Sequence, residues 1–403
     1  MIRLPQATLT HSSGNISLTA GIKGTSKGGN ATLKSSGLKI TKLLESARAI
    51  NPAVPDLNVA GALGVNMNVV LDASGLPTTD GSITLQNVSA APDKNTEISS
   101  LSGDIKISGP VTNILVQADA LQLNYNKSPI KLNGTLRASP QTLKIEALNV
   151  DAFKGTTRLV SNVSLGEQMV IAASPKINDI SLGDLFGAVK PSLNGFIQGT
   201  LKTFQGEFSG IKSNDPAKTI SGTASVLIGE GALKDYNLAQ QVLQSVEGLP
   251  FLSGTLRSKV PPEFEAVVAK PDTGIREFRS KLSLNQGAAN FSELYLESDI
   301  FSITSKGTYK PSGEVHLPAT IRFNPPFSRA ITERVVELKA LLDSSGRLEL
   351  PIVIHGTLPK VVAAPDIPVI IRKATVGGVR QAVTGALRGG KGVGKALGGL
   401  MGF

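Results

Sequence analysis

Residues 347–358 read RLELPIVIHGTL, and the alternation in this stretch decides the fold class. Every second residue is apolar or glycine: Leu348, Leu350, Ile352, Ile354, Gly356 and Leu358. The alternate positions include four polar residues: Arg347, Glu349, His355 and Thr357. Successive side chains of a β-strand point to opposite faces, so the pattern predicts a strand with one buried and one wetted face, as antiparallel sheets commonly have.

The same period of two recurs along most of the chain, most clearly in residues 65–71, 121–125 and 220–228. No regular alternation of strands with helices occurs, which argues against a parallel α/β core. The sequence therefore predicts a mainly β protein with a long antiparallel curved sheet. Turns are expected at four glycine-containing pairs: Asp80-Gly81, Asn133-Gly134, Asn194-Gly195 and Ser345-Gly346.

A tetrapeptide of the form hydrophobe–X–Gly–Thr occurs at residues 22–25, 132–135, 153–156, 197–200, 220–223, 252–255 and 354–357. In a strand, its glycine replaces a side chain on the apolar face. Glycine weakens a strand unless a bend, a bulge or a close approach is needed there. We therefore expect Gly134, Gly199, Gly254 and Gly356 to let the sheet curl into an open, taco-like groove. Ordinary strand and turn chemistry without a role in ligand binding is the alternative interpretation.

Helical patterns are few and short. They cover residues 40–50, residues 181–189 with Ser181 as the N-cap, residues 238–246 and residues 328–343. The last of these has an apolar stripe: Ile331, Val335, Leu338 and Leu342. We expect these helices to lie over parts of the sheet.

The composition and the missing motifs argue against an enzyme. The 403 residues include no Cys and no Trp, so disulfides and thiol chemistry are excluded. The three histidines (His11, His316 and His355) are far apart in the sequence, so a shared metal or catalytic site is not expected. Nucleotide-binding loops and the motifs of zinc proteases and serine hydrolases are missing from the sequence. We expect no catalytic residue, no metal and no cofactor.

The last thirty residues differ from the rest. From Arg372 onward there are six basic residues and no acidic one, against a net charge of +10 for the chain. Ten glycines between Gly377 and Gly402 would cost a helix roughly 8–10 kcal/mol relative to alanine, so a helix should form here chiefly against a membrane or partner. The expected membrane contacts are Arg372, Lys373, Val379, Arg380, Val383, Leu387, Lys391, Lys395 and Leu397. A disordered, solubilising tail is the alternative, and nucleic acid is not expected because no aromatic residues lie between the basic ones.

From about Ile220 onward the sequence resembles the C-terminal region of the AsmA-like family of Gram-negative envelope proteins. The matching stretches are residues 220–239, 290–303 and 346–360, followed by a Pro365-Asp366 step into a terminal helix. The resemblance implies a repeating β-groove that moves phospholipid between the inner and outer membranes or supports outer-membrane assembly. It also implies a periplasmic, membrane-associated location and an N-terminal inner-membrane helix. No apolar run of the required ~20 residues occurs here, so we expect that helix in a longer parent chain.

We therefore expect a β-groove middle region over residues 1–190, an AsmA-like C-terminal β-groove region over 191–371 and a basic Gly-rich amphipathic tail over 372–403. The expected partners are phospholipid and membrane surfaces. Acyl chains are expected to lie along Leu284, Leu294, Leu296, Leu348, Leu350, Ile352 and Ile354. The main alternative is a docking or assembly module with envelope protein partners. A transmembrane β-barrel or a secreted β-solenoid is disfavoured, because the chain has few aromatics and an irregular Gly-Thr spacing.

Overall fold

The structure is a computed structural model that describes residues 2–22, 28–51, 58–72, 75–93, 95–190, 195–213, 215–247, 256–357 and 360–376. The chain divides into two compact units. Unit 1 comprises residues 1–194 and 203–216, and unit 2 comprises residues 195–202 and 217–403. Strand β12 (Ile197–Ile211) and the 3₁₀ helix η2 (Pro216–Thr219) contain residues of both units.

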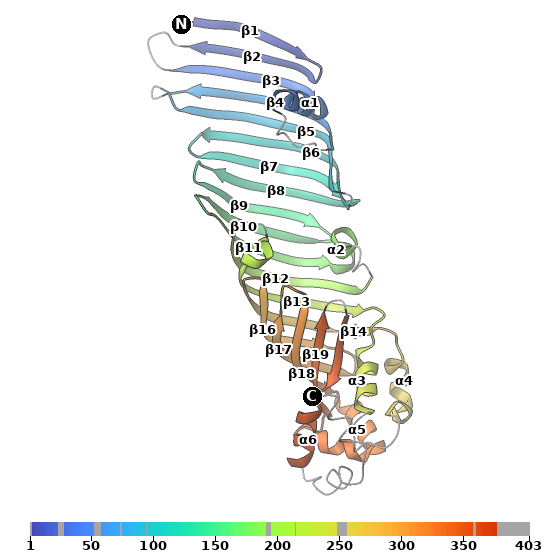
Figure 1. The fold of residues 1–403 in the computed structure, drawn as a ribbon. Coiled ribbons are helices and arrows are strands. Elements are labelled where there is room, and N and C mark those ends of the chain that lie inside the picture. Colours follow the sequence, from blue (N-terminus) through green and yellow to red (C-terminus); the bar gives the residue numbers. More distant parts are fainter. Residues whose placement is uncertain are drawn as a thin grey trace. The chain divides into compact units, whose positions relative to one another are not determined.

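The first unit consists mainly of long strands (Figure 1). They are β1 (Ile2–His11), β2 (Gly14–Ile22), β3 (Gly29–Lys39), β4 (Val59–Leu71), β5 (Pro77–Asp93), β6 (Thr96–Pro110), β7 (Ile114–Tyr125), β8 (Ser128–Ala138), β9 (Thr142–Ala152), β10 (Gly155–Leu165) and β11 (Met169–Ser181). Two helices, α1 (Ile40–Ile50) and α2 (Leu182–Val189), follow β3 and β11.

Each strand of this unit pairs antiparallel with the next one along the chain, from β1–β2 to β10–β11. Among the described residues β1 pairs only with β2, and no register joins it to β11, so the sheet of unit 1 is open. Because the strands alternate in direction, every odd-numbered strand has its C-terminal end on the same side of this sheet. We call the line of these strand ends the edge of the sheet. Helices α1 and α2 and the β7–β8 and β9–β10 turns therefore share one edge (Figure 1).

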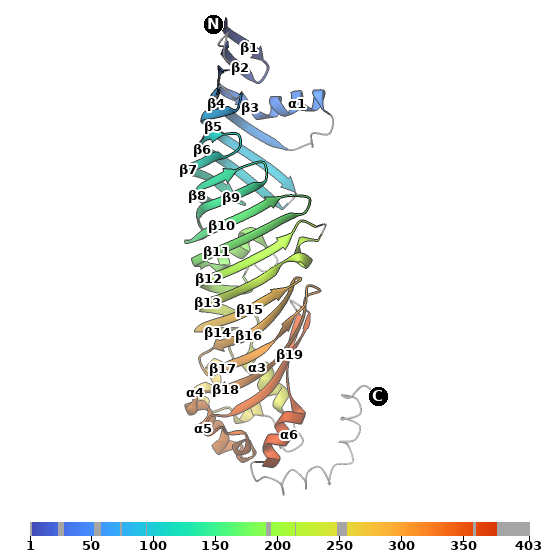
Figure 2. The ribbon, with the colours of Figure 1, turned by 90° about the vertical axis from the view of Figure 1, so that its left-hand side faces the viewer.

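Bulges bend the strands of unit 1 (Figure 2). In β5 the register shifts between Leu85 and Val88, and Asn87 within this shift has a φ of 48°. Strand β7 repeats the feature at Ala120, with a φ of 51°. Such left-handed residues increase the local bend and twist of a strand. Gly61 on β4 accommodates the bulge of β5, because a Cβ atom there would lie 2.6 Å from the Cα of Val88.

Two of the turns expected from the sequence lie inside strands. Gly81 is in β5 and pairs with Met67 on one side and Ile107 on the other. The predicted Asn133-Gly134 turn lies inside β8 in the same way. Pairing with strands on both sides overrides the local turn preference of these pairs. The turn prediction at Ser345-Gly346 is confirmed, since Gly346 N donates to the Asp343 carbonyl at 3.0 Å, and Asn194 lies outside the described residues.

Two hairpins of unit 1 turn at residues where the sequence analysis did not predict a turn. The β7–β8 turn has φ of 46° at Asn126 and 70° at Lys127. The β9–β10 turn has φ of 51° at Phe153 and 68° at Lys154, where a Gly-Thr tetrapeptide begins. Positive φ at both positions is the requirement of a two-residue type I′ turn, whose twist matches that of the strands.

Unit 2 combines a second antiparallel sheet with a cluster of helices. Its strands are β13 (Ser221–Leu233), β14 (Thr273–Ile275), β15 (Glu277–Asn285), β16 (Ala288–Glu297), β17 (Phe301–Tyr309), β18 (Glu314–Phe323), β19 (Glu349–Thr357) and β20 (Lys360–Pro365). Its helices are α3 (Leu238–Glu247), η3 (Leu256–Lys259), α4 (Pro262–Val268), α5 (Pro325–Arg334), η4 (Val336–Leu341) and α6 (Ile367–Val376). Strand β13 pairs with β14 and β15, and β15 to β20 pair in sequence order.

The helices of unit 2 close a hydrophobic core against one face of its sheet. Phe323 at the end of β18 stacks on Phe327 of α5 with ring centroids 4.8 Å apart, and Phe264 of α4 packs edge-on against Phe327 at 5.2 Å. Ile321 and Leu350 are at most 1 % exposed beneath these helices. A core between a sheet and helices on one of its faces is the usual two-layer arrangement.

The structure confirms the predicted mainly β, antiparallel organisation and most of the expected helices. Helix α1 has the predicted bounds, and Ser181 caps α2 by accepting a bond from Asp184 N. The single helix expected over 328–343 is wrong: α5 ends at Arg334 and η4 starts at Val336, because β-branched Val335 has a non-helical backbone. Helix α4 was not expected.

Candidate apolar binding surface

A row of directly paired residues crosses unit 1 from β2 to β11. We call it the apolar ladder, and its members in strand order are Leu18, Leu33, Met67, Gly81, Ile107, Val116, Leu136, Ile145, Ser161 and Ala173. Eight of the ten are apolar side chains, and each is the register partner of the next. Residues that face each other across a ladder lie on the same side of the sheet. One face of unit 1 therefore presents an unbroken, mostly apolar row.

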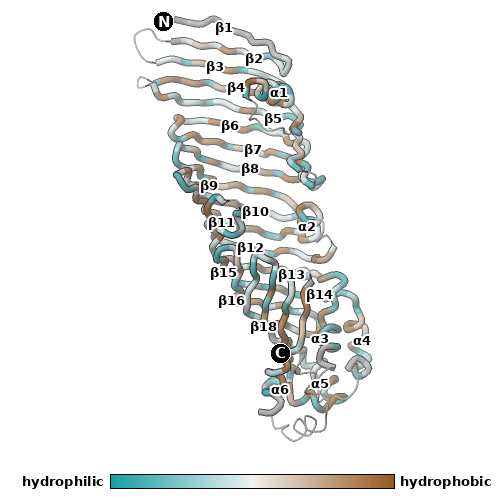
Figure 3. Tube along the Cα trace, viewed as in Figure 1, coloured by the Kyte–Doolittle hydropathy of each residue, from teal (hydrophilic) through white to brown (hydrophobic). Residues whose placement is uncertain are grey.

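A second row runs parallel to the apolar ladder, two residues away along each strand up to β8. Its members are Ile16, Ser35, Val65, Ile83, Ile105, Ala118, Gly134, Leu148, Leu159 and Pro175. Together the two rows form an apolar stripe that crosses ten strands. Figure 3 shows the same alternation of hydrophobic and hydrophilic positions along these strands.

The opposite face of unit 1 is polar. Its row from β3 to β8 reads Lys34, Asn66, Ser82, Lys106, Gln117 and Thr135. Lys106 pairs with Asp119 at 2.9 Å, and Thr32 donates to Asn68 at 3.2 Å on the same face. The two faces of this sheet therefore differ sharply in polarity.

The apolar ladder is exposed or half-buried from Leu18 to Ile145, on eight strands, whereas Ser161 on β10 is buried. Leu18 and Leu33 are 46 % and 37 % exposed, and the ladder side chains from Met67 to Ile145 are half-buried. Helix α1 contacts β3 and β4, and α2 contacts β11 and the tips of the β7–β8 and β9–β10 hairpins. Exposed apolar strips on folded proteins are typical of interaction sites and ligand-binding grooves, so this strip is the candidate binding surface.

The seven residues predicted to contact acyl chains are all in unit 2, and the structure divides them. Leu296, Leu348, Leu350 and Ile352 belong to the core, and the last three are at most 2 % exposed. In this conformation they pack against protein side chains and have no surface left for a ligand. Leu284, Leu294 and Ile354 lie on the same sheet face but are half-buried, outside the fully covered part.

The glycines predicted to shape the sheet lie at close approaches between strands. Gly134 is opposite Ala118 and Leu148 in the second apolar row. Gly199 and Gly356 have φ of 133° and 130°, a backbone region that favours glycine. A Cβ atom at Gly199 would lie 2.9 Å from the Glu230 carbonyl oxygen, so only glycine fits without a shift. Gly254 lies outside the described residues.

Two of the residues expected to contact a membrane are described, both in α6. Lys373 forms an ion pair with Glu349 of β19, and Arg322 of β18 donates to the same carboxylate at 3.0 Å. Burial alone would raise the pKa of Glu349, but the hydrogen bond and charge of Lys373, with the charge of Arg322, hold it below its usual range. Lys373 therefore ties α6 to the sheet. The remaining predicted contacts lie outside the described residues: Val379, Arg380, Val383, Leu387, Lys391, Lys395 and Leu397.

Two histidines that are far apart in the sequence are neighbours in the structure. His316 and His355 are separated by a helix and a 3₁₀ turn in sequence but are direct register partners on β18 and β19. Both side chains are exposed. Within the described residues, no group of three or more His, Cys, Asp or Glu side chains is placed to hold a metal ion.

Comparisons with protein families, curated proteins and solved structures find no match to this chain. Among the residues that the structure describes, none of the helices has the length and apolar character needed to span a bilayer. The apolar ladder was not expected as a site, although the alternation in residues 65–71 and 121–125 marks the strands that build it.

Proposed function

We propose that this chain is a non-enzymatic lipid-binding protein whose apolar ladder carries the acyl chains of phospholipid. One observation supports this proposal above the others: eight strands of unit 1, β2 to β9, share an apolar ladder whose side chains are exposed or half-buried. In unit 2, equivalent alternation in β17, β18 and β19 is covered by helices and becomes a core. The apolar face of unit 2 is covered by helices, whereas the described part of unit 1 has no such cover over its apolar ladder. Bound lipid would supply this cover.

The dimensions suit acyl chains. Strands lie about 4.8 Å apart, so the ladder spans roughly 43 Å, longer than the ~30 Å hydrocarbon core of a bilayer. Each methylene removed from water contributes about 0.8 kcal/mol, so about ten methylenes on the ladder contribute up to ~8 kcal/mol before the costs of association. A continuous path of equivalent contacts favours movement along the ladder, because no single position holds the chain much more tightly than its neighbour.

The resemblance to AsmA-like proteins gives this surface a biological setting. On that basis we extend the proposal to phospholipid movement between the inner and outer membranes, from a periplasmic, membrane-associated position. The rival is a docking or assembly module whose apolar face binds an envelope protein.

Lipid analysis of the purified protein tests the proposal. The chain, purified in a mild detergent and transferred to detergent-free buffer, should retain phospholipid that organic extraction and mass spectrometry identify. It should also bind a fluorescent fatty acid with saturation. Protein that is lipid-free and does not bind the probe would contradict lipid binding, and co-purification of a stoichiometric protein partner in place of lipid would favour the docking module.

A further inference from the structure

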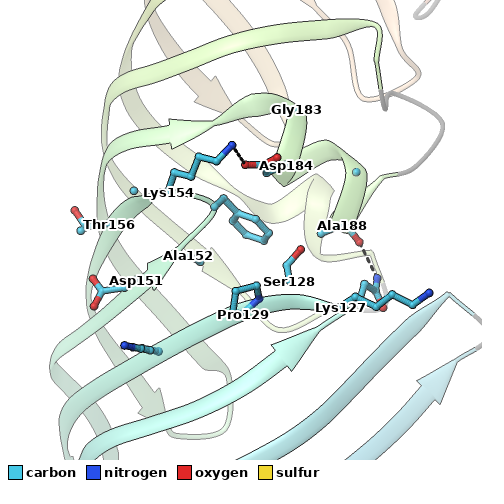
Figure 4. A pocket seen from close by; sticks show the side chains of 15 residues that line it. Lys127, Ser128, Pro129, Asp151, Ala152, Lys154, Thr156, Gly183, Asp184 and Ala188 are labelled. Atoms are coloured by element: carbon cyan, nitrogen blue, oxygen red, sulfur yellow. Dashed lines mark hydrogen bonds and ion pairs between the residues drawn. The ribbon is translucent and has the colours of Figure 1, made fainter.

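A hollow of about 870 Å³ lies in unit 1 between helix α2 and the tips of the β7–β8 and β9–β10 hairpins (Figure 4). It is at the edge where the odd-numbered strands end. Three lysines and two aspartates line it: Lys127, Lys131, Lys154, Asp151 and Asp184. Its lining thus has a formal charge of +1. Lys127 and Lys154 are in the hairpin turns, whereas Lys131 and its register partner Asp151 are on the polar face of the sheet, beside the hollow.

Helix α2 is held over the hairpin tips at both ends. At its start, Ser181 N donates to the Phe153 carbonyl at 2.8 Å. At its end, Asn126 Nδ2 donates to the Ala188 carbonyl at 2.7 Å. Between them, Lys154 pairs with Asp184 at 2.9 Å, as Figure 4 shows. These contacts fix the walls of the hollow before any ligand arrives.

The helix surface toward the hollow is lined with glycine. Gly183 and Gly187 are one turn apart on the eight-residue helix α2, and both line the hollow. Each glycine destabilises a helix interior by about 1 kcal/mol relative to alanine. Packing does not require the first of them, since a Cβ atom at Gly183 would meet nothing within 4 Å. The sequence therefore leaves space open where a larger residue would stabilise the helix.

The positive charge in the hollow is only partly neutralised. Lys154 is paired with Asp184, whose pKa is lowered chiefly by the hydrogen bond from Lys154, so this carboxylate stays ionised near neutral pH. Lys127 and Lys131 form no ion pair with any residue of the described part of the chain. Asp151 is the register partner of Lys131, so the lining keeps one net positive charge for an anion, and phosphate is the anion that lysine commonly binds as a point charge.

The hollow adjoins the apolar surface. Ala152, which lines it, is on the same face of β9 as Val150 and Leu148, and Leu148 belongs to the second apolar row. Four strand residues correspond to roughly 13 Å, well within the length of a phospholipid. A phosphate in the hollow and acyl chains on the apolar rows can therefore belong to one molecule.

On the basis of the lipid binding proposed above, we propose that this hollow binds the phosphate headgroup of a phospholipid whose acyl chains lie on the apolar ladder. A related but smaller hollow, of about 470 Å³, lies beside α1 at the same edge and is lined by Lys39 and Lys42. This edge would then hold headgroups in a row, one at each hollow.

Binding of dioctanoyl phosphatidic acid and dioctanoyl glycerol to the whole chain separates the headgroup from the acyl chains. The triple variant Lys127→Gln, Lys131→Gln, Lys154→Gln should bind the phosphatidic acid at least 10-fold more weakly and the glycerol within 2-fold of wild type. The control variant Lys34→Gln, Lys106→Gln, Lys144→Gln removes the same charge from exposed positions of the polar face and should leave both affinities within 2-fold.

Asp184→Asn is the matching gain-of-binding variant. It frees Lys154 and raises the formal charge of the hollow to +2, so it should tighten phosphatidic acid binding about 2- to 5-fold. A misfolded variant does not bind a ligand more tightly, so this result cannot come from a folding defect.

Each alternative outcome has a distinct meaning. If wild type binds both lipids and neither lysine set nor Asp184→Asn changes phosphatidic acid binding, the headgroup site is wrong and the acyl surface stands. If inorganic phosphate displaces phosphatidic acid at equal concentration, the hollow is a free-phosphate site and the lipid headgroup is refuted. If wild type binds neither lipid, the proposed function itself fails.

Discussion

A charge placed in the middle of the apolar ladder should abolish lipid binding with little effect on the fold. Val116 on β7 is the register partner of Ile107 and Leu136, at the centre of the ladder. Its side chain is half-buried and faces no second layer among the described residues. Val116→Asp therefore leaves the new carboxylate hydrated in the lipid-free protein, but an acyl chain lying over it must remove that water.

The two effects differ in size. Loss of half-buried apolar area and of strand preference should lower the stability of unit 1 by roughly 2 kcal/mol, or about 4–8 °C in Tm. A carboxylate against hydrocarbon costs about 2.5–3.5 kcal/mol on insertion scales. That cost corresponds to roughly 70- to 350-fold in the Kd for lipid.

The matched control is the next residue. Gln117 lies on the opposite face, between Lys106 and Thr135, so Gln117→Asp adds the same charge where no lipid is expected. Titration with a fluorescent fatty acid, with Tm measured in parallel, compares the two variants. Equal weakening by Val116→Asp and Gln117→Asp, or normal binding by Val116→Asp, would refute the assignment of the acyl surface to the apolar ladder.

Three further results are expected from the same structure. Leu350→Ala should destabilise unit 2 by about 2–5 kcal/mol because Leu350 is 1 % exposed, whereas Leu136→Ala on the uncovered ladder should cost clearly less; denaturant unfolding compares them. Gly199→Ala should destabilise the protein by about 1–3 kcal/mol, because Gly199 has a φ of 133° and a Cβ atom there would lie 2.9 Å from the Glu230 carbonyl oxygen. Gly166→Ala, where a Cβ atom would meet nothing within 4 Å, should be near neutral. Thermal melting compares the two variants. Burial of Glu349 opposes its ionisation, but its two cationic partners outweigh this effect, so its pKa lies below the usual 4.5. The stability of unit 2 should therefore drop as the pH falls through 4.5 and lower. Thermal melts in acid should show a smaller drop for Glu349→Gln.

Most of the fold can be predicted from the alternation of apolar and polar residues. The pattern at 65–71 and 348–358 is enough to predict antiparallel strands with one apolar face, and the helix bounds at 40–50 follow from local periodicity. The same local pattern misplaces Gly81, whose Asp-Gly pair predicts a turn. Its position inside β5 depends on pairing with Met67 and Ile107, which are about 14 and 26 residues away in sequence.

The sequence predicts that an apolar binding surface exists, but not where on the protein it lies. Leu350 and Leu136 have the same alternating context, so the sequence predicts an apolar face at both. What covers each face depends on distant elements: Leu350 is buried in a core that includes residues of α4, α5 and α6, whereas Leu136 is only half-buried. The lysines of the hollow illustrate the same limit, because Lys127, Lys154 and Asp184 meet only through hairpin topology.

Site-specific photo-crosslinking in cells can show whether acyl chains lie on the apolar ladder. A benzophenone amino acid at Leu136, on the apolar ladder, should capture phospholipid that mass spectrometry detects on the protein. The same group at the adjacent Arg137, which faces the other side of β8 and pairs with Glu146 at 2.8 Å, should not. We expect phospholipid to be captured from Leu136 alone. Capture from both positions alike, or from neither, would contradict this expectation.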